Sequence, residues 1–293
     1  MSASLRGVLP VDKPEGPTSH DVVAAARRAL GTRRIGHTGT LDPFASGLLL
    51  LCVGQATRIA EYLTDLPKTY RATMRLGVAT DTADRTGAPV SESAAWRELS
   101  RDRIAAALAS QVGRIRQLPP AYSAKKVAGE RAYDRARRGE AVRLEPAEVE
   151  IYRLDVLAWD LPDITFEVVC SSGTYIRAIA RDVGEALGVG GHLVALRRTR
   201  IGRHDVDRAV PVERLTDAAA VRAAWMSPLA ALGHLPRVDV DAAGASALRH
   251  GRALPLRRGD RPAHTPIAVA HGGALLAIGE FDDERLRPRK VFQ

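Results

Sequence analysis

The chain has 293 residues, of which 45% are hydrophobic and 26% charged, and its formal net charge is +9. This length allows a substantial core and about two domains. The basic side chains are 38 Arg and only 5 Lys, and the multi-donor guanidinium suits phosphate. The longest run of aliphatic and cysteine residues, 48–53, is too short to span a bilayer, and the N-terminus lacks the apolar core of a signal peptide. We therefore expect a cytoplasmic protein without a membrane segment.

The first third of the chain predicts strands and a helix in succession. Residues 7–14 form a short strand that a proline ends, and the helix 18–31 begins with a capping box at Thr18 and stops at a glycine. The continuous apolar run 48–53 is typical of a strand buried on both faces. Residues 68–77 alternate between apolar and polar side chains, as in a strand with one buried face.

The middle of the chain continues this mixture. We predict an amphipathic helix around 100–112, a basic stretch over 125–143, an alternating strand at 165–170 and a helix within 171–188, whose apolar residues follow helical spacing. Strands and helices interleave irregularly, which favours a mixed α/β (α+β) sheet over a strict βαβ repeat.

The C-terminal part of the chain has a different composition. It becomes alanine-rich after about residue 215, and 267–281 reads as a hairpin around a Gly-Gly turn. This pattern predicts a small all-β unit from about residue 236. We therefore divide the chain into a domain over 1–232 and a second, β-rich domain over 233–293.

Several familiar chemistries lack their motifs in this sequence. Cys52 and Cys170 lie in apolar or alternating runs, as buried thiols do. Zinc-ligand spacing, HExxH and the phosphate-binding loop GxxxxGK[ST] do not occur, and GVGGHL fails the GxGxxG pattern. We therefore expect an enzyme on this chain to work from its side chains, without a metal or a nucleotide cofactor.

Asp42 is the side chain with the most unusual setting. It lies in GHTGTLDPFASGLL, directly before Pro43 and among small residues. A residue that precedes proline is disfavoured in the α conformation, so an extended or turn geometry holds this carboxylate. The small neighbours leave room for a ligand to approach. An Asx turn ahead of the next strand explains the same pattern without any function, so the spacing alone leaves both interpretations open.

Five ordered segments carry a resemblance to a known family. They are DKPEGPTSHD, GHTGTLDPFASGLL, KTYRATMRLGVATDTADRTG, PPAYSAKKVAGERAYDRARRG and SSGTYIRAIARDVGEALGVGGHLVALRRTRIG, and together they span roughly residues 7 to 205. In sequence and order they resemble the bacterial tRNA pseudouridine synthase B (TruB) family. The resemblance implies the mixed-sheet pseudouridine-synthase fold followed by a small PUA-like domain. It implies isomerisation of uridine 55 in the T loop of tRNA, by base flipping and without a cofactor.

The resemblance also implies three catalytic residues. Asp42 matches the essential carboxylate, which acts as a nucleophile or removes a sugar proton; the sequence leaves both routes open. Arg177 matches the arginine that pairs with this carboxylate and lowers its pKa, although helical spacing alone favours a solvated arginine. Tyr70 matches the tyrosine that stacks on the target base, although its position on a strand also fits a core aromatic residue.

Further positions match the family's binding or supporting residues. His37 matches a histidine that fills the space left by the extruded nucleotide, and Leu196 a residue that packs beside the base. We assign Lys126, Arg197 and Arg198 to substrate binding, the last two within an arginine cluster that includes Arg200 and Arg203. Lys13 and Pro14 match residues that support the active-site loop. The family's C-terminal domain binds the acceptor-stem side of tRNA, and we expect a monomer.

Two rival interpretations have the same basic surfaces. An RNA chaperone would open the tRNA elbow without chemistry, and it would not need Asp42, Tyr70 and Arg177 in one pocket. An N-glycosidase would use a similar carboxylate but would release the base. Loss of uracil would identify the N-glycosidase, whereas a pseudouridine synthase converts uridine without a change in mass.

Overall fold

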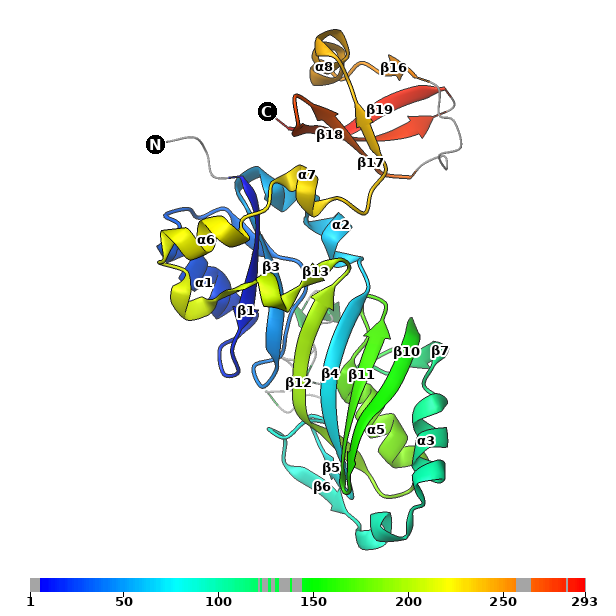
Figure 1. Ribbon diagram of the computed structural model, residues 1–293. Coiled ribbons are helices and arrows are strands. Elements are labelled where there is room, and N and C mark those ends of the chain that lie inside the picture. Colours follow the sequence, from blue (N-terminus) through cyan, green and yellow to red (C-terminus); the bar gives the residue numbers. More distant parts are fainter. Residues whose placement is uncertain are drawn as a thin grey trace.

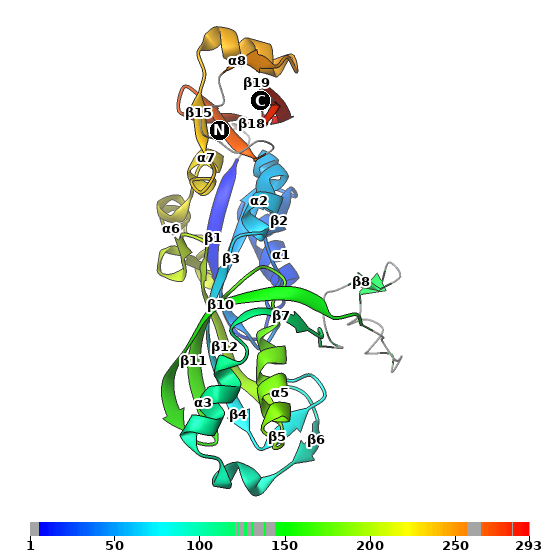
Figure 2. The same cartoon turned by 90° about the vertical axis from the view of Figure 1, so that its right-hand side faces the viewer.

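The structure is a computed structural model that describes residues 6–120, 122, 126–127, 130–131, 138, 144–256, 265–282 and 284–292. A larger α/β unit and a small β unit lie one above the other in both views (Figure 1 and Figure 2). They are joined through the segment that contains α7 (Pro228–Ala231). Within the described ranges, every helix is too short or too polar to traverse a bilayer.

The larger unit is built on one mixed sheet. Its described strands are β1 (Gly7–Lys13), β2 (Ile35–His37), β3 (Ser46–Val53), β4 (Lys68–Leu76), β7 (Gly113–Gln117), β10 (Ala147–Asp160), β11 (Asp163–Cys170), β12 (Gly191–Ile201), β13 (His204–Asp205) and β14 (Val210–Pro211). They pair in the order β14-β1-β3-β12-β4-β11-β10-β7, with β13 beside β12 and β2 beside β3. The β12–β3 and β1–β14 pairs are parallel, whereas the others are antiparallel. The predicted mixed sheet is confirmed.

Shorter strands and helices complete this unit. The strands β5 (Val78–Thr80) and β6 (Pro89–Glu92) form one pair, and β8 (Lys126–Val127) and β9 (Glu130–Arg131) form another. The α-helices among its described residues are α1 (Ser19–Ala29), α2 (Ala60–Thr64), α3 (Arg101–Ala109), α5 (Ile176–Ala186) and α6 (Ala218–Ala224). The 3-10 helices are Gly54–Ile59, Ala94–Glu98, Val206–Arg208 and Val212–Arg214.

The strand β3 confirms the prediction of a strand buried on both faces. Alternate residues of a strand point to opposite faces, and Leu49 and Leu51 pack with α1 and α6. Leu48 and Leu50 pack in the opposite cluster, which holds Ile59 and residues of the small β unit. Because apolar neighbours cover both faces, its sequence can be uniformly apolar.

Most of the predicted elements are present, but two long strands were missed. The helix α1 has the predicted capping box at Thr18, and α3, α5, β4 and β11 lie where the sequence placed them. The strand β10 was missed because bulges near Arg153 and Ala158 break its alternation. The strand β12 was missed because its exposed and buried residues likewise follow no regular period.

The small unit contains five described strands in the order β15-β17-β18-β19-β16. They are β15 (Arg237–Asp239), β16 (Leu254–Pro255), β17 (Ile267–His271), β18 (Ala274–Asp282) and β19 (Arg285–Val291). The predicted hairpin is confirmed as β17–β18. The unit is not all-β, because α8 (Ala242–Arg249) packs on its sheet. The alanine-rich segment after Asp241, which caps α8, was a helix signal that our interpretation passed over.

The small unit docks on the α/β unit through apolar and polar contacts. Ile278 and Phe292 join the cluster on one face of β3. Arg58 donates to the carbonyl of Val291 at 2.6 Å, and its guanidinium lies 5.0 Å from the centroid of the Phe292 ring. Lys290 donates to the carbonyl of Arg58 at 2.9 Å.

Gly47 allows β3 and β12 to approach closely. It has φ +107, and a Cβ at this position would lie 2.2 Å from the carbonyl oxygen of Arg198, its partner in the parallel pair. Gly16 has nearly the same φ, +106, but no heavy atom lies within 4 Å of a Cβ added there. A comparison of the same substitution at the two glycines therefore separates the cost of a positive φ from the cost of the steric contact.

We predict that Gly47→Ala lowers the free energy of unfolding by about 1–3 kcal/mol more than Gly16→Ala does. Both substitutions place an alanine at positive φ, but only the first forces backbone atoms apart. Urea denaturation of the two variants measures the difference. Equal losses would show that the close approach of β12 to Gly47 has no energetic consequence.

Candidate active site

Asp42 lies on the loop between β2 and β3, and buried polar side chains hold the backbone on either side of it. The hydroxyl of Ser19 accepts from the N–H of Leu41 at 2.9 Å and donates to its carbonyl at 3.1 Å. The ammonium of Lys13 lies 3.4 Å from the carbonyl of Pro43 and donates to two further proline carbonyls. Ser19 and Lys13 are almost fully buried, so these contacts fix the backbone on both sides of Asp42.

Arg198 holds the same loop from β12. Its guanidinium donates to the carbonyls of Gly39, Thr40 and Leu48 at 3.1, 3.5 and 2.8 Å. The residue is only 1% exposed. We predicted Arg198 on a phosphate-binding surface, and the structure instead places it inside, where it satisfies backbone carbonyls that would otherwise be buried without a partner.

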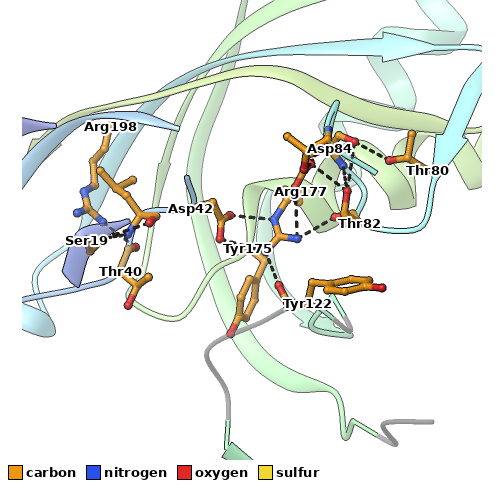
Figure 3. A network of polar contacts seen from close by, with 12 residues as sticks. Ser19, Thr40, Asp42, Thr80, Thr82, Asp84, Tyr122, Tyr175, Arg177 and Arg198 are labelled. Carbon is orange, nitrogen blue, oxygen red and sulfur yellow. Dashed lines mark hydrogen bonds and ion pairs between the residues drawn. The ribbon is translucent and has the colours of Figure 1, made fainter. Parts of the chain in front are cut away.

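Arg177 faces Asp42 across the pocket from the first turn of α5 (Figure 3). Its Nε lies 2.9 Å from Asp42 Oδ2 and its Nη2 3.3 Å from Oδ1. The guanidinium also donates to the carbonyls of Thr82 and Tyr122, both at 2.8 Å. A second carboxylate, Asp84, lies 3.6 Å from Nη1. The arginine is 3% exposed, so the interpretation as a solvated helix residue is wrong.

This ion pair lies in the wall of a cavity of about 230 Å³. Its lining includes Asp42, Arg177, Tyr70 and Leu196, together with the loop 171–175 before α5. Tyr70 and Leu196 are both more than nine-tenths buried, and they give the cavity an apolar wall beside the carboxylate. The side chain of Asp42 keeps 33% of its exposure, because one side of it faces the cavity.

The pKa of Asp42 is raised above its ordinary value, chiefly because the surrounding protein removes water from the carboxylate. Arg177 acts in the opposite direction and lowers the pKa, whereas the negative charge of Asp84 raises it further. The arginine thus lowers the pKa as the resemblance implies, but the effect of burial is larger. The ion pair favours the ionised carboxylate against the effect of burial.

Two buried lysines and a tyrosine lie around the carboxylate. Burial lowers the pKa of Lys13 to about 8, although Asp42 acts against this. Burial also lowers the pKa of Lys68 to about 8, and Lys68 lines the cavity with its ammonium bonded to the carbonyls of Thr64 and Leu66. Burial raises the pKa of Tyr70, so the phenol stays protonated at neutral pH.

The other predicted residues lie at different distances from the cavity. His37 is half-buried outside its lining, with its ring edge-on to that of His20 at 5.5 Å. Arg197 forms a two-point ion pair with Asp12, with contacts of 3.0 and 2.7 Å. The exposed Pro14 accepts from Lys13 through its carbonyl. The side chain of Lys126 and most of the basic stretch 125–143 lie outside the described residues.

Sequence reasoning missed four residues that shape the site. Ser19 was taken only as part of a helix start, Asp84 as part of a polar turn, and Lys68 as a strand residue. Gln117, which contacts the residue before α5, carried no signal. Among the described residues, no group of three or more His, Cys, Asp or Glu side chains is placed to hold a metal ion.

Comparisons with known proteins identify the family. Residues 27–176 match a family model described as "TruB family pseudouridylate synthase (N terminal domain)". The chain belongs to the TruB family of pseudouridylate synthases. Residues 177–232 match a second TruB model, described as "tRNA pseudouridylate synthase B C-terminal domain". The resemblance in the five sequence segments is thereby confirmed.

Curated relatives in the TruB family cover nearly the whole chain. The tRNA pseudouridine synthase B of Mycobacterium bovis (strain BCG / Pasteur 1173P2) is 48% identical over 259 residues, which are 87% of this chain and 86% of the relative. That of Ralstonia pickettii (strain 12J) is 47% identical over 98% of this chain and 94% of the relative. That of Geobacter sulfurreducens is 41% identical over 98% and 99%.

Solved structures share the fold along the chain. A chain in "Structure of H/ACA RNP bound to a substrate RNA containing 2'-deoxyuridine" is 27% identical with a TM-score of 0.76, over 98% of this chain and 85% of that one. A chain in "Crystal Structure of a Cbf5-Nop10-Gar1 Complex" is 28% identical with a TM-score of 0.74, over 98% and 85%. The predicted pseudouridine-synthase fold with a small C-terminal β unit is confirmed.

We predict that Asp84→Asn lowers the pKa of Asp42, because it removes the nearby negative charge and leaves Arg177 paired with a single carboxylate. A ¹³C NMR titration of the Asp42 carboxyl carbon measures the shift. Asp163→Asn is the control, since Asp163 forms an ion pair with Arg75 and neither residue lines the cavity. An unchanged or higher midpoint in Asp84→Asn would contradict the electrostatic account.

Proposed function

We propose that this chain isomerises uridine 55 in the T loop of tRNA to pseudouridine, with Asp42 as the essential carboxylate. The observation that carries the proposal is the ion pair of Asp42 and Arg177 at a cavity lined by Tyr70 and Leu196. The names of the curated relatives support tRNA as the substrate. The solved neighbour with a bound substrate RNA supports an RNA-binding pocket in this fold.

The target uridine enters this cavity only after it leaves the base stack, which costs a few kcal/mol. Stacking on the ring of Tyr70 returns about 1–3 kcal/mol, and Leu196 covers the other side of the base. The apolar wall excludes water from the reacting atoms. This arrangement favours an isomerisation, since a base that is held after bond cleavage rotates and rejoins the sugar instead of departing.

Asp42 is ionised when it reacts. It attacks the sugar or base as a nucleophile, or it removes a sugar proton to give a glycal; both routes use the carboxylate form. Arg177 orients the two carboxylate oxygens through its Nε and Nη2. The phenol of Tyr70 is protonated, so it cannot accept a proton from the base until it has lost its own. Its first role is therefore to stack on the base.

The remaining parts of the proposal concern binding. The C-terminal domain, over 233–293 after a catalytic domain over 1–232, is PUA-like and contacts the acceptor-stem side of tRNA. The exposed side chains of Arg249 and Arg252 support this. Lys126 and Arg197 contact the T arm, and His37 fills the space of the extruded nucleotide. The protein acts in the cytoplasm as a monomer without a cofactor.

We predict that Asp42→Asn abolishes pseudouridine formation and leaves tRNA binding within about threefold of the wild type, since it removes one charge and no volume. Nucleoside analysis of an unmodified tRNA transcript and a filter-binding assay give the two readings. Asp163→Asn is the matched control and keeps activity. Undiminished pseudouridine in Asp42→Asn would exclude the proposed catalytic role, and free uracil from the wild type would favour the N-glycosidase.

We also predict a steep fall of tRNA affinity with salt. If about 6–10 phosphates are contacted, the association constant drops by about 10³–10⁵ between about 50 and 200 mM salt, because bound counterions are released on binding. Binding measured by fluorescence over this range tests the assignment. A flat profile would refute a binding surface made of arginines.

A further inference from the structure

Gln117 ties the edge of the large sheet to the start of α5. It is the last residue of β7, where it pairs with Ala147 of β10, and it is 1% exposed. Its side-chain oxygen accepts from the N–H of Tyr175 at 2.8 Å, and its side-chain nitrogen donates to the carbonyl of the same residue at 3.1 Å. The side-chain amide of Gln117 therefore binds both the N–H and the carbonyl of Tyr175.

This contact serves a helix end that lacks a suitable cap of its own. Tyr175 is the N-cap residue of α5, and tyrosine is not among the side chains that cap helices well. Its φ of −99° and ψ of 109° are extended, so its backbone can pair with a neighbour as a strand residue does. Of the neutral side chains of this length, only glutamine offers a donor and an acceptor in the required arrangement.

We propose that Gln117 is a positioning residue for the reaction: it fixes the backbone at Tyr175 and thereby aims Arg177, two residues further on, at Asp42. The inference rests on the proposed function for its activity readout. Gln117 does not line the cavity, so it acts only through the residues it holds.

The stretch that begins at Gln117 returns to the same helix twice more. Arg181 donates to the carbonyl of Leu118 at 2.9 Å, and Arg177 donates to the carbonyl of Tyr122 at 2.8 Å. Three ties thus join Gln117, Leu118 and Tyr122 to the first turns of α5. Two of them act close to Arg177: the amide of Gln117 holds the backbone of Tyr175, and the carbonyl of Tyr122 accepts from the guanidinium itself.

The charge balance at Asp42 gives this role a specific signature. The titratable groups that act on Asp42 are Arg177 of α5, Asp84 after β5, Lys13 of β1 and Tyr70 of β4. Arg177 is the largest influence that favours the ionised carboxylate. A misaligned guanidinium weakens that influence, so the pKa of Asp42 rises while Lys13, Asp84 and Tyr70 stay in place.

The first test compares Gln117→Leu with the wild type on an unmodified tRNA transcript. We expect kcat to fall roughly 10- to 100-fold, as misplacements of about 1 Å do, with KM for tRNA unchanged. We also expect the acid limb of the kcat profile and the NMR titration of the Asp42 carboxyl to move to higher pH. Gln111→Leu, at a half-buried glutamine after α3 and outside the cavity lining, is the matched control and changes neither.

A second variant separates positioning from a loss of folding. In Gln117→Glu the carboxylate accepts from Tyr175 but cannot donate, whereas the protonated acid restores both bonds. We expect the ratio of its kcat to that of the wild type to rise as the pH falls, with circular dichroism showing a folded protein throughout. This variant decides the question if Gln117→Leu does not fold.

The outcomes are distinct from those for the proposed function. Wild-type kcat and an unmoved Asp42 titration in Gln117→Leu, or a pH-independent ratio in Gln117→Glu, would overturn the positioning role. A wild-type protein that makes no pseudouridine would instead overturn the proposed function, and the Asp42 titration in Gln117→Leu would still decide whether Gln117 aims Arg177.

Discussion

The contact on which the site depends is the ion pair between Asp42 and Arg177. Enclosure by the protein opposes ionisation of the carboxylate, and Asp84 adds a second negative charge nearby. The guanidinium, which also donates to two backbone carbonyls, is the largest influence that offsets these effects, and the charge of Lys13 adds to it. A buried arginine between two carboxylates is costly to desolvate unless its donors are satisfied. Thr82, Tyr122 and Asp42 accept from the two Nη atoms of Arg177, whereas its Nε lies in ion-pair contact with Asp42 without a hydrogen bond.

The two members of the pair are held by independent means. Asp42 sits on a loop whose backbone is bound by Lys13, Ser19 and Arg198, which come from three different elements. Arg177 lies on a helix that packs on β4, β11 and β12 through its apolar residues. Neither side chain therefore depends on the other for the position of its backbone.

How far the sequence predicts this site depends on the range of each signal. Local patterns found β3, the capping box of α1 and the unusual setting of Asp42, since each needs only neighbouring residues. Family resemblance was needed for Arg177, because helical spacing cannot reveal a partner 135 positions away. The position of Arg198 was misjudged for the same reason. A run of arginines predicts an exposed surface, but Arg198 is buried and donates to backbone carbonyls about 150 positions away in the sequence.

The small β unit is connected to the cavity through one short segment. Lys290 forms an ion pair with Glu61 and lies 5.3 Å from the ring centroid of Tyr62, on the helix α2. That helix ends at Thr64, whose carbonyl binds the ammonium of Lys68 in the cavity wall. The helix that contacts the small unit through Glu61 and Tyr62 thus also supplies Thr64 to the cavity lining. The docking surface of this unit and one side of the cavity therefore share the helix α2.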